Sequence, residues 1–115
     1  MLTAIVTNDR NVVANQENVM TTVRPKADAI TQISNGAVVV TEWKFAPGEE
    51  TGWHKHQHDY VVVPLTVGAL TLETKEGLVS ADLFPGQSYS RPKGIEHNVI
   101  NGNDFDISFV EIELL

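Results

Sequence analysis

The chain has 115 residues, 42% of them hydrophobic, which suffices for one domain with its own core and is too short for two. Its net charge of −7 argues against nucleic-acid and anionic-membrane partners, since both need basic surfaces. Cysteine is absent, which excludes disulfides and thiolate ligands. The apolar stretches are too short to cross a bilayer and the start lacks a basic leader, so we expect a cytoplasmic protein.

The first 35 residues differ in composition from the rest and are predicted to form an N-terminal arm. Residues 7–18 are polar and contain four Asn. Two short apolar stretches follow, at residues 19–23 and 29–33, on either side of a segment that contains Pro25. The first is interpreted as a strand, and the second as a short strand or a turn.

From residue 36 to residue 115 the apolar pattern is typical of β-strands, within a single domain that spans residues 1–115. Strands are expected at Gly36–Phe45, Tyr60–Leu65, Leu70–Thr74, Leu78–Leu83, Ser88–Arg91, His97–Ile100 and Phe105–Leu115. Turn residues separate them about every ten residues, and no segment has a sustained helical period. This pattern predicts an all-β sandwich or barrel of six to eight strands.

Three of the four histidines lie within five residues, at His54, His56 and His58. Two steps along a strand place the first two imidazoles on one face, with Cα atoms roughly 6.6 Å apart, from which both could reach one metal ion. A third ligand would have to come from elsewhere, and His97 is the remaining histidine. A polar loop that happens to be rich in histidine explains this segment equally well.

Two motifs favour the metal site. The second reads Gly-x5-Pro-x-Gly-x2-His-x3-Asn at Gly86, Pro92, Gly94, His97 and Asn101, and the first begins Gly-x5-His-x-His at Gly48, His54 and His56. The sequence resembles the cupin superfamily in both, and in its Thr-Gly-Trp-His-x-His-x-x-Asp-Tyr segment it is similar to the small cupins of bacterial β-alanine degradation clusters. The resemblance implies a double-stranded β-helix, or jelly-roll, barrel, often a homodimer, with one divalent metal near its mouth.

By this resemblance His54, His56 and His97 are the metal ligands, and Tyr60 occupies the position at which cupins usually have a glutamate ligand. Three neutral imidazoles should bind more weakly than the usual set and should favour Zn, Ni, Fe, Cu or Mn over Mg or Ca. Tyr60, the candidate catalytic residue, could ligate as phenolate, hydrogen-bond a metal-bound water, or only pack. His58 is expected in an exposed loop, although it too could assist in acid–base chemistry.

These observations predict a metal-dependent enzyme acting on a small organic acid or amino-acid derivative, by dioxygenase-like or hydrolase- or isomerase-like chemistry. The alternatives are a non-catalytic sensor or carrier of a small-molecule ligand, and a degenerate barrel that only dimerises. A homodimer is expected, with the arm covering a sheet edge. Arg91 is expected at a solvated strand end, where it could also meet an anionic substrate. Glu111 and Glu113 are expected on a solvent-facing edge.

Overall fold

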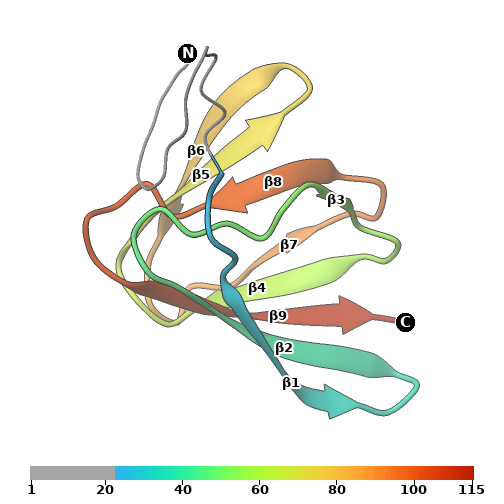
Figure 1. Ribbon diagram of the computed structural model, residues 1–115. Helices are drawn as coiled ribbons and strands as arrows, with labels where there is room; N and C mark the ends of the chain where they lie inside the picture. The colour runs from blue at the N-terminus through green and yellow to red at the C-terminus, as the bar shows by residue number, and fades with distance from the viewer. Residues whose placement is uncertain (1–22) are drawn as a thin grey trace.

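The computed structural model describes residues 23–115, and this part of the chain contains nine β-strands and no helix (Figure 1). The strands are β1 (Asp28–Ser34), β2 (Val38–Phe45), β3 (His54–Lys55), β4 (Tyr60–Pro64), β5 (Gly68–Thr74), β6 (Gly77–Leu83), β7 (Tyr89–Arg91), β8 (Glu96–Ile100) and β9 (Ile107–Leu114). The prediction of an all-β fold is confirmed. Within this range there is no helix that could cross a membrane.

The strands form two sheets that face each other (Figure 1). One has five strands in the order β1-β2-β9-β4-β7, and the other has four in the order β3-β8-β5-β6. Every pairing between named strands is antiparallel. Because strands distant in sequence alternate between the layers, this is the double-stranded β-helix that the two motifs predict.

The core lies between the sheets and follows from the period-two alternation of the strands. In β4, Tyr60, Val62 and Pro64 are buried while the residues between them are only partly so. The most deeply buried large side chains are Phe45, Leu83 and Ile107, each about 1% exposed. In the first half of β9 the same alternation buries Ile107 and Phe109.

Asn101, the last residue of the second motif, is fully buried and links the end of β2 to the loop between β8 and β9. Its amide nitrogen donates to the carbonyls of Phe45 and Phe105, and its side-chain oxygen accepts from the backbone and the side chain of Asn103. Gly94, in the turn before β8, has φ +96°, a conformation that other residues rarely adopt. Asn101 and Gly94 are therefore motif residues that stabilise loops and turns of the fold.

The individual strands can be compared with the predicted ones. Residues 28–34 of the predicted arm form a strand, β1, which adds to the edge of the five-stranded sheet with a register shift between Thr31 and Ile33. Residues 36–115 contain eight strands, β2–β9, within the six to eight that the pattern predicts. The strand that contains His54 is only two residues long. The edge position predicted for Glu111 and Glu113 is wrong, because β9 lies between β2 and β4. The strand expected at residues 19–23 lies, except for Val23, outside the described residues.

Candidate metal centre

The fold brings together His54 of β3, His56 of the turn that follows it, and His97 of β8. His54 in β3 is the direct cross-strand partner of His97 in β8. His56 follows the end of β3, and its backbone is held against the β7–β8 turn by bonds from its N–H to the Ile95 carbonyl and from the Gly94 N–H to its own carbonyl. The Pro-x-Gly turn of the second motif therefore also positions His56.

The Nε2 atoms of the three rings converge. His56 Nε2 lies 3.1 Å from His54 Nε2 and 3.2 Å from His97 Nε2. Tetrahedral coordination at a Zn–N distance of about 2.0–2.1 Å separates two ligand nitrogens by about 3.3 Å. The observed spacing is therefore close to what a single ion requires.

The opposite ring nitrogens show which tautomers are present. His54 Nδ1 lies 2.8 Å from the carbonyl oxygen of Gly52, and because a carbonyl can only accept, Nδ1 carries the proton. His56 Nδ1 faces the Glu111 carboxylate at 3.3 Å, which favours the same tautomer. Both Nε2 atoms then present lone pairs to each other at 3.1 Å, an arrangement that a shared cation satisfies. The residues present therefore fit a divalent transition ion.

The Gly52 carbonyl that receives His54 is itself fixed. The Gly52 N–H donates to the side-chain oxygen of Asn98 at 2.9 Å, and the Thr51 hydroxyl donates to the Gly52 carbonyl. Asn98 in turn donates from its amide nitrogen to Glu50 and Glu73. This chain of hydrogen bonds fixes the orientation of the His54 ring.

Glu111 plays the corresponding role for His56 and was missed at the sequence level. One carboxylate oxygen faces His56, and the other accepts a hydrogen bond from the Trp43 indole at 3.0 Å. Burial, reinforced by Glu113, raises the pKa of Glu111, and the indole hydrogen bond opposes this shift. The strand alternation could have predicted an inward position for Glu111, because it shares its strand face with the buried Ile107 and Phe109.

Burial also acts on the imidazoles. It lowers the pKa of His56 to about 4, with further contributions from the neighbouring His54 and His97. It lowers the pKa of His97 to about 4, where His54 and Arg91 contribute as well. Both rings are therefore neutral near pH 7, as metal ligands must be.

Tyr60 lies beside the three histidines, with its ring stacked on that of His56. The ring centroids are 3.8 Å apart and the planes are inclined by 15°. Burial, followed by the nearby Glu111, raises the pKa of Tyr60, so the phenol is neutral near pH 7. A phenolate ligand would need the opposite shift, which leaves packing and hydrogen bonding as the roles that this environment favours.

A cavity of about 230 Å³ opens between the two sheets at the histidines. Its walls are mainly apolar, and its lining includes Val62, Leu70, Leu72, Val79, Ala81, Tyr89, Val99 and Phe109. Arg91 and Glu96 lie among the lining residues. The volume is below the roughly 300–1,000 Å³ of sites for drug-sized ligands, so the cavity suits a small molecule.

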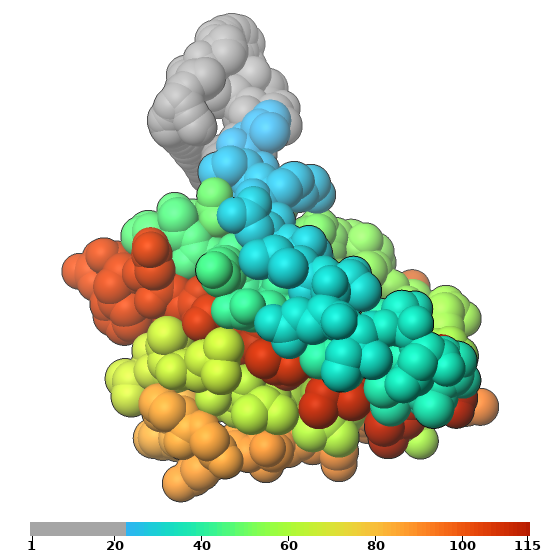
Figure 2. Space-filling model, turned by 90° about the horizontal axis from the view of Figure 1, so that it is seen from below, coloured from blue at the N-terminus to red at the C-terminus, as the bar shows by residue number. Residues whose placement is uncertain are grey.

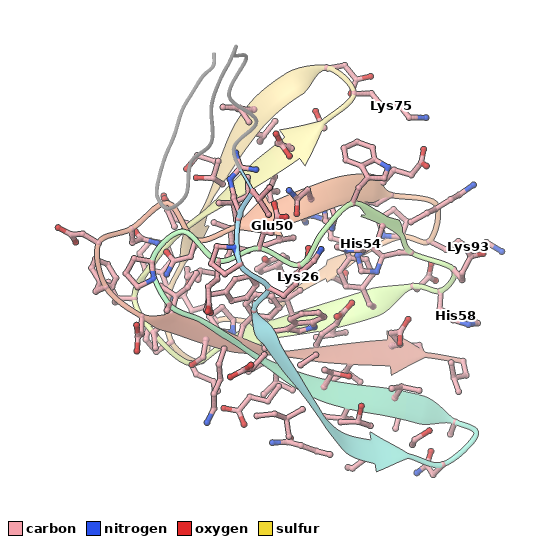
Figure 3. All side chains as sticks on the ribbon, in the orientation of Figure 1. Lys26, Glu50, His54, His58, Lys75 and Lys93 are labelled. Atoms are coloured by element: carbon pink, nitrogen blue, oxygen red, sulfur yellow. The ribbon has the colours of Figure 1, made fainter. Side chains whose placement is uncertain are left out.

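His58 is not part of this cluster. It lies in the turn between β3 and β4 and is directed away from His54 (Figure 3). Its neighbour Asp59 accepts a hydrogen bond from the Lys93 N–H and so ties this turn to the β7–β8 turn. The three histidines other than His58 are the group that could hold a metal ion in the described part of the chain.

Known proteins resemble most of this chain. It is 57% identical to the beta-alanine degradation protein BauB of Pseudomonas aeruginosa over 91 residues, which are 79% of this chain and 96% of that protein. It is also 57% identical to a cupin domain from Bordetella pertussis of known crystal structure, with a TM-score of 0.80 over 83% of this chain and 99% of that one. This chain belongs to the cupin family.

More distant cupins share only the fold. A cupin superfamily protein from Desulfitobacterium hafniense is 16% identical with a TM-score of 0.62, over 83% of each chain. An RmlC-like cupin from Methanocaldococcus jannaschii is 11% identical with a TM-score of 0.65, over 95% of this chain and 93% of that one. No protein-family model matches the sequence. Within the family, this chain is a small cupin that resembles BauB.

Proposed function

We propose that this cupin is a metal-dependent enzyme that acts on a small organic acid or amino-acid derivative, with His54, His56 and His97 as the metal ligands. The observation that carries the proposal is the convergence of the three Nε2 atoms, with neighbours 3.1 and 3.2 Å apart, at an apolar cavity. Three protein ligands leave coordination positions open, as in catalytic rather than structural sites. The ion would be Zn, Ni, Fe, Cu or Mn, because imidazoles favour these over Mg or Ca.

When bound, such an ion would supply Lewis acidity or, if it is redox-active, oxygen chemistry. The chain itself supplies the surroundings. Glu111 and Trp43 hold the His56 ring in place, and Gly52 holds His54. Apolar side chains around the cavity limit the access of water, which strengthens electrostatic interactions there. Tyr60 contributes a neutral phenol beside His56, where it acts as a hydrogen-bond donor or acceptor toward the substrate.

The substrate class is supported by the relative in Pseudomonas aeruginosa, which is named for beta-alanine degradation. The intermediates of such a process are small acids and amino acids. A cavity of about 230 Å³ accommodates molecules of this size. We therefore assign the chain to a step of small-acid metabolism of this kind.

Metal content tests the site. The purified parent should hold close to one transition ion per chain, and replacing His54, His56 or His97 with Ala should lower occupancy sharply, because two imidazoles make a poor site. His58→Ala is the matched control and should leave occupancy unchanged. Elemental analysis gives the result. Equal loading of the parent and the three site variants would contradict the metal site.

Turnover tests the enzyme. The protein reconstituted with Fe(II) or with Zn should convert small acids, including β-alanine, with product seen by NMR and oxygen uptake followed for the Fe(II) form. The His97→Ala variant should be inactive. Binding of an acid by the loaded protein without any conversion would support the second candidate.

That second candidate is a non-catalytic cupin that binds a metal or small molecule as a sensor or carrier. One observation favours it. Among the cavity-lining residues, Glu111 is committed to His56 and Trp43, and Glu96 is paired with Lys75, so neither carboxylate is free as a general base. The turnover experiment separates the two candidates.

We also propose that the protein is a homodimer. The outward face of the five-stranded sheet carries Val40, Val61, Val63, Val110 and Ile112, which the strand register places side by side. These side chains are partly buried, and in residues 23–115 no further sheet lies beyond the two that enclose the core. A solvated sheet face normally carries polar side chains, so a second copy of the chain is the occupant that this apolar face suits.

A further inference from the structure

Arg91 lines the cavity and is its one permanently positive side chain among the described residues. In the described part of the chain it is the only Lys or Arg among the lining residues. In the register of β4 and β7 it is paired with Tyr60, and Tyr89 is paired with Val62. All four residues line the cavity, so the Arg91 side chain faces the same space as the neutral Tyr60 phenol.

The Arg91 side chain is exposed, and two contacts orient its guanidinium without neutralising it. It lies over the Tyr89 ring at 4.7 Å from the centroid, and one N–H donates to the Ser90 carbonyl at 3.1 Å. Among residues 23–115, no carboxylate forms an ion pair with it. Because a guanidinium carries five N–H donors, several remain for a ligand.

The two carboxylates of the cavity are engaged elsewhere. Glu96 is paired with Lys75 at 2.6 Å, and Glu111 contacts His56 and Trp43. They therefore do not cancel the positive charge of Arg91. In a chain with net charge −7, this leaves one uncompensated cation beside an apolar space of about 230 Å³.

We propose that Arg91 binds the carboxylate of the substrate and so selects small acid anions over neutral molecules of the same shape. A guanidinium matches a carboxylate through two parallel N–H···O bonds, and stacking on Tyr89 leaves the edge of the fork free for this. The rest of the acid lies against Leu72, Val79 and Val99 of the cavity wall. This inference rests on the proposed function and names the group that determines its substrate class.

Binding of propionate and of its neutral isostere propionamide tests the proposal, with full-length protein in the zinc-loaded and zinc-depleted forms. NMR titration should show that the parent binds propionate more tightly than propionamide in both forms. Arg91→Gln should weaken propionate binding about tenfold or more, the range expected for loss of a charge-assisted pair. Arg91→Lys should fall between, because it keeps the charge and loses the fork.

Lys93→Gln is the matched control, since Lys93 carries the same charge, follows β7, and is directed away from the cavity (Figure 3). It should bind propionate as the parent does. The proposal is overturned if propionate binds Arg91→Gln as tightly as the parent, if binding requires zinc and not Arg91, or if propionamide binds equally well. Zinc content should be equal in the parent and in Arg91→Gln, so the outcome is independent of the metal-site test.

Discussion

The cupin resemblance assigns Tyr60 to the position of the usual acidic ligand, and its ring is stacked on that of His56. Tyr60→Phe keeps the stack and removes only the hydroxyl, so zinc affinity should stay within about threefold of the parent, or about 0.6 kcal/mol. Tyr60→Glu adds a carboxylate to three neutral imidazoles and should tighten zinc binding about tenfold or more.

Competition with a chromophoric chelator measures both zinc affinities. Loss of the stacking contact should lower the thermal stability of Tyr60→Glu, since an aromatic pair contributes about 0.5–1.5 kcal/mol. Tyr60→Phe controls for this loss, because it retains the stack. A large fall in zinc affinity in Tyr60→Phe would show that the hydroxyl ligates the ion or orients its water.

The buried imidazoles also make the stability of the metal-free protein depend on pH. Burial lowers the pKa of His56 and of His97 to about 4, from 6.5 in the unfolded chain. Between these values the folded state binds fewer protons than the unfolded state, so the free energy of unfolding falls as the pH drops from 6.5 toward 4. A pKa difference of one unit corresponds to about 1.4 kcal/mol, so acidification should lower the free energy of unfolding measurably.

Thermal unfolding of chelator-treated protein at pH 7 and pH 4.5 tests this dependence. The parent should lose Tm on acidification, and His97→Asn, which removes one of the two titrating rings, should lose less. His58→Asn removes a histidine outside the cluster and should behave as the parent does. An equal fall in Tm for the parent and His97→Asn would show that other groups cause the acid sensitivity.

At the scale of the strands, the sequence predicts most of what surrounds the site. The apolar alternation and the turn residues locate the strands from Tyr60 onward, because β4 has one buried face and most of the turns that follow contain Gly, Pro or Asn. The two motifs select His54, His56 and His97, which the structure brings together. These features are local, so a linear pattern is enough to reveal them.

What the sequence does not reveal depends on sheet order. The acidic end of β9 resembles a charged edge strand until the pairing places β9 between β2 and β4, where Glu111 reaches His56. Similarly, Arg91 ends a short strand, and only the pairing of β7 with β4 turns it toward the cavity. The pairing of Arg91 with Tyr60 spans 31 positions and the contact of Glu111 with His56 spans 55, and no local periodicity specifies such strand order.

At the scale of the whole molecule, the main feature is the apolar outward face of the five-stranded sheet, which a partner could bury. The apolar side chains of β2, β4 and β9 on this face continue onto β1, where Ile30 and Ile33 are 42% and 47% exposed. Figure 2 shows the β1–β2 hairpin in blue-green beside the red β9 on this side of the molecule. Apolar patches of this kind on a small domain mark interaction sites.

Light scattering on a size-exclusion column should therefore give about twice the chain mass of 12.6 kDa at micromolar concentration. Val110→Lys places a charge at the centre of the outward face, where two copies of a two-fold dimer would bring like charges together, and should shift the protein to monomer. Leu78→Lys adds the same charge to β6, on the other sheet, where Leu78 is 71% exposed, and should leave the mass unchanged. Circular dichroism confirms that each variant is folded. A parent that elutes as a monomer would contradict the dimer, and a dimer that persists in Val110→Lys would exclude this face as its interface.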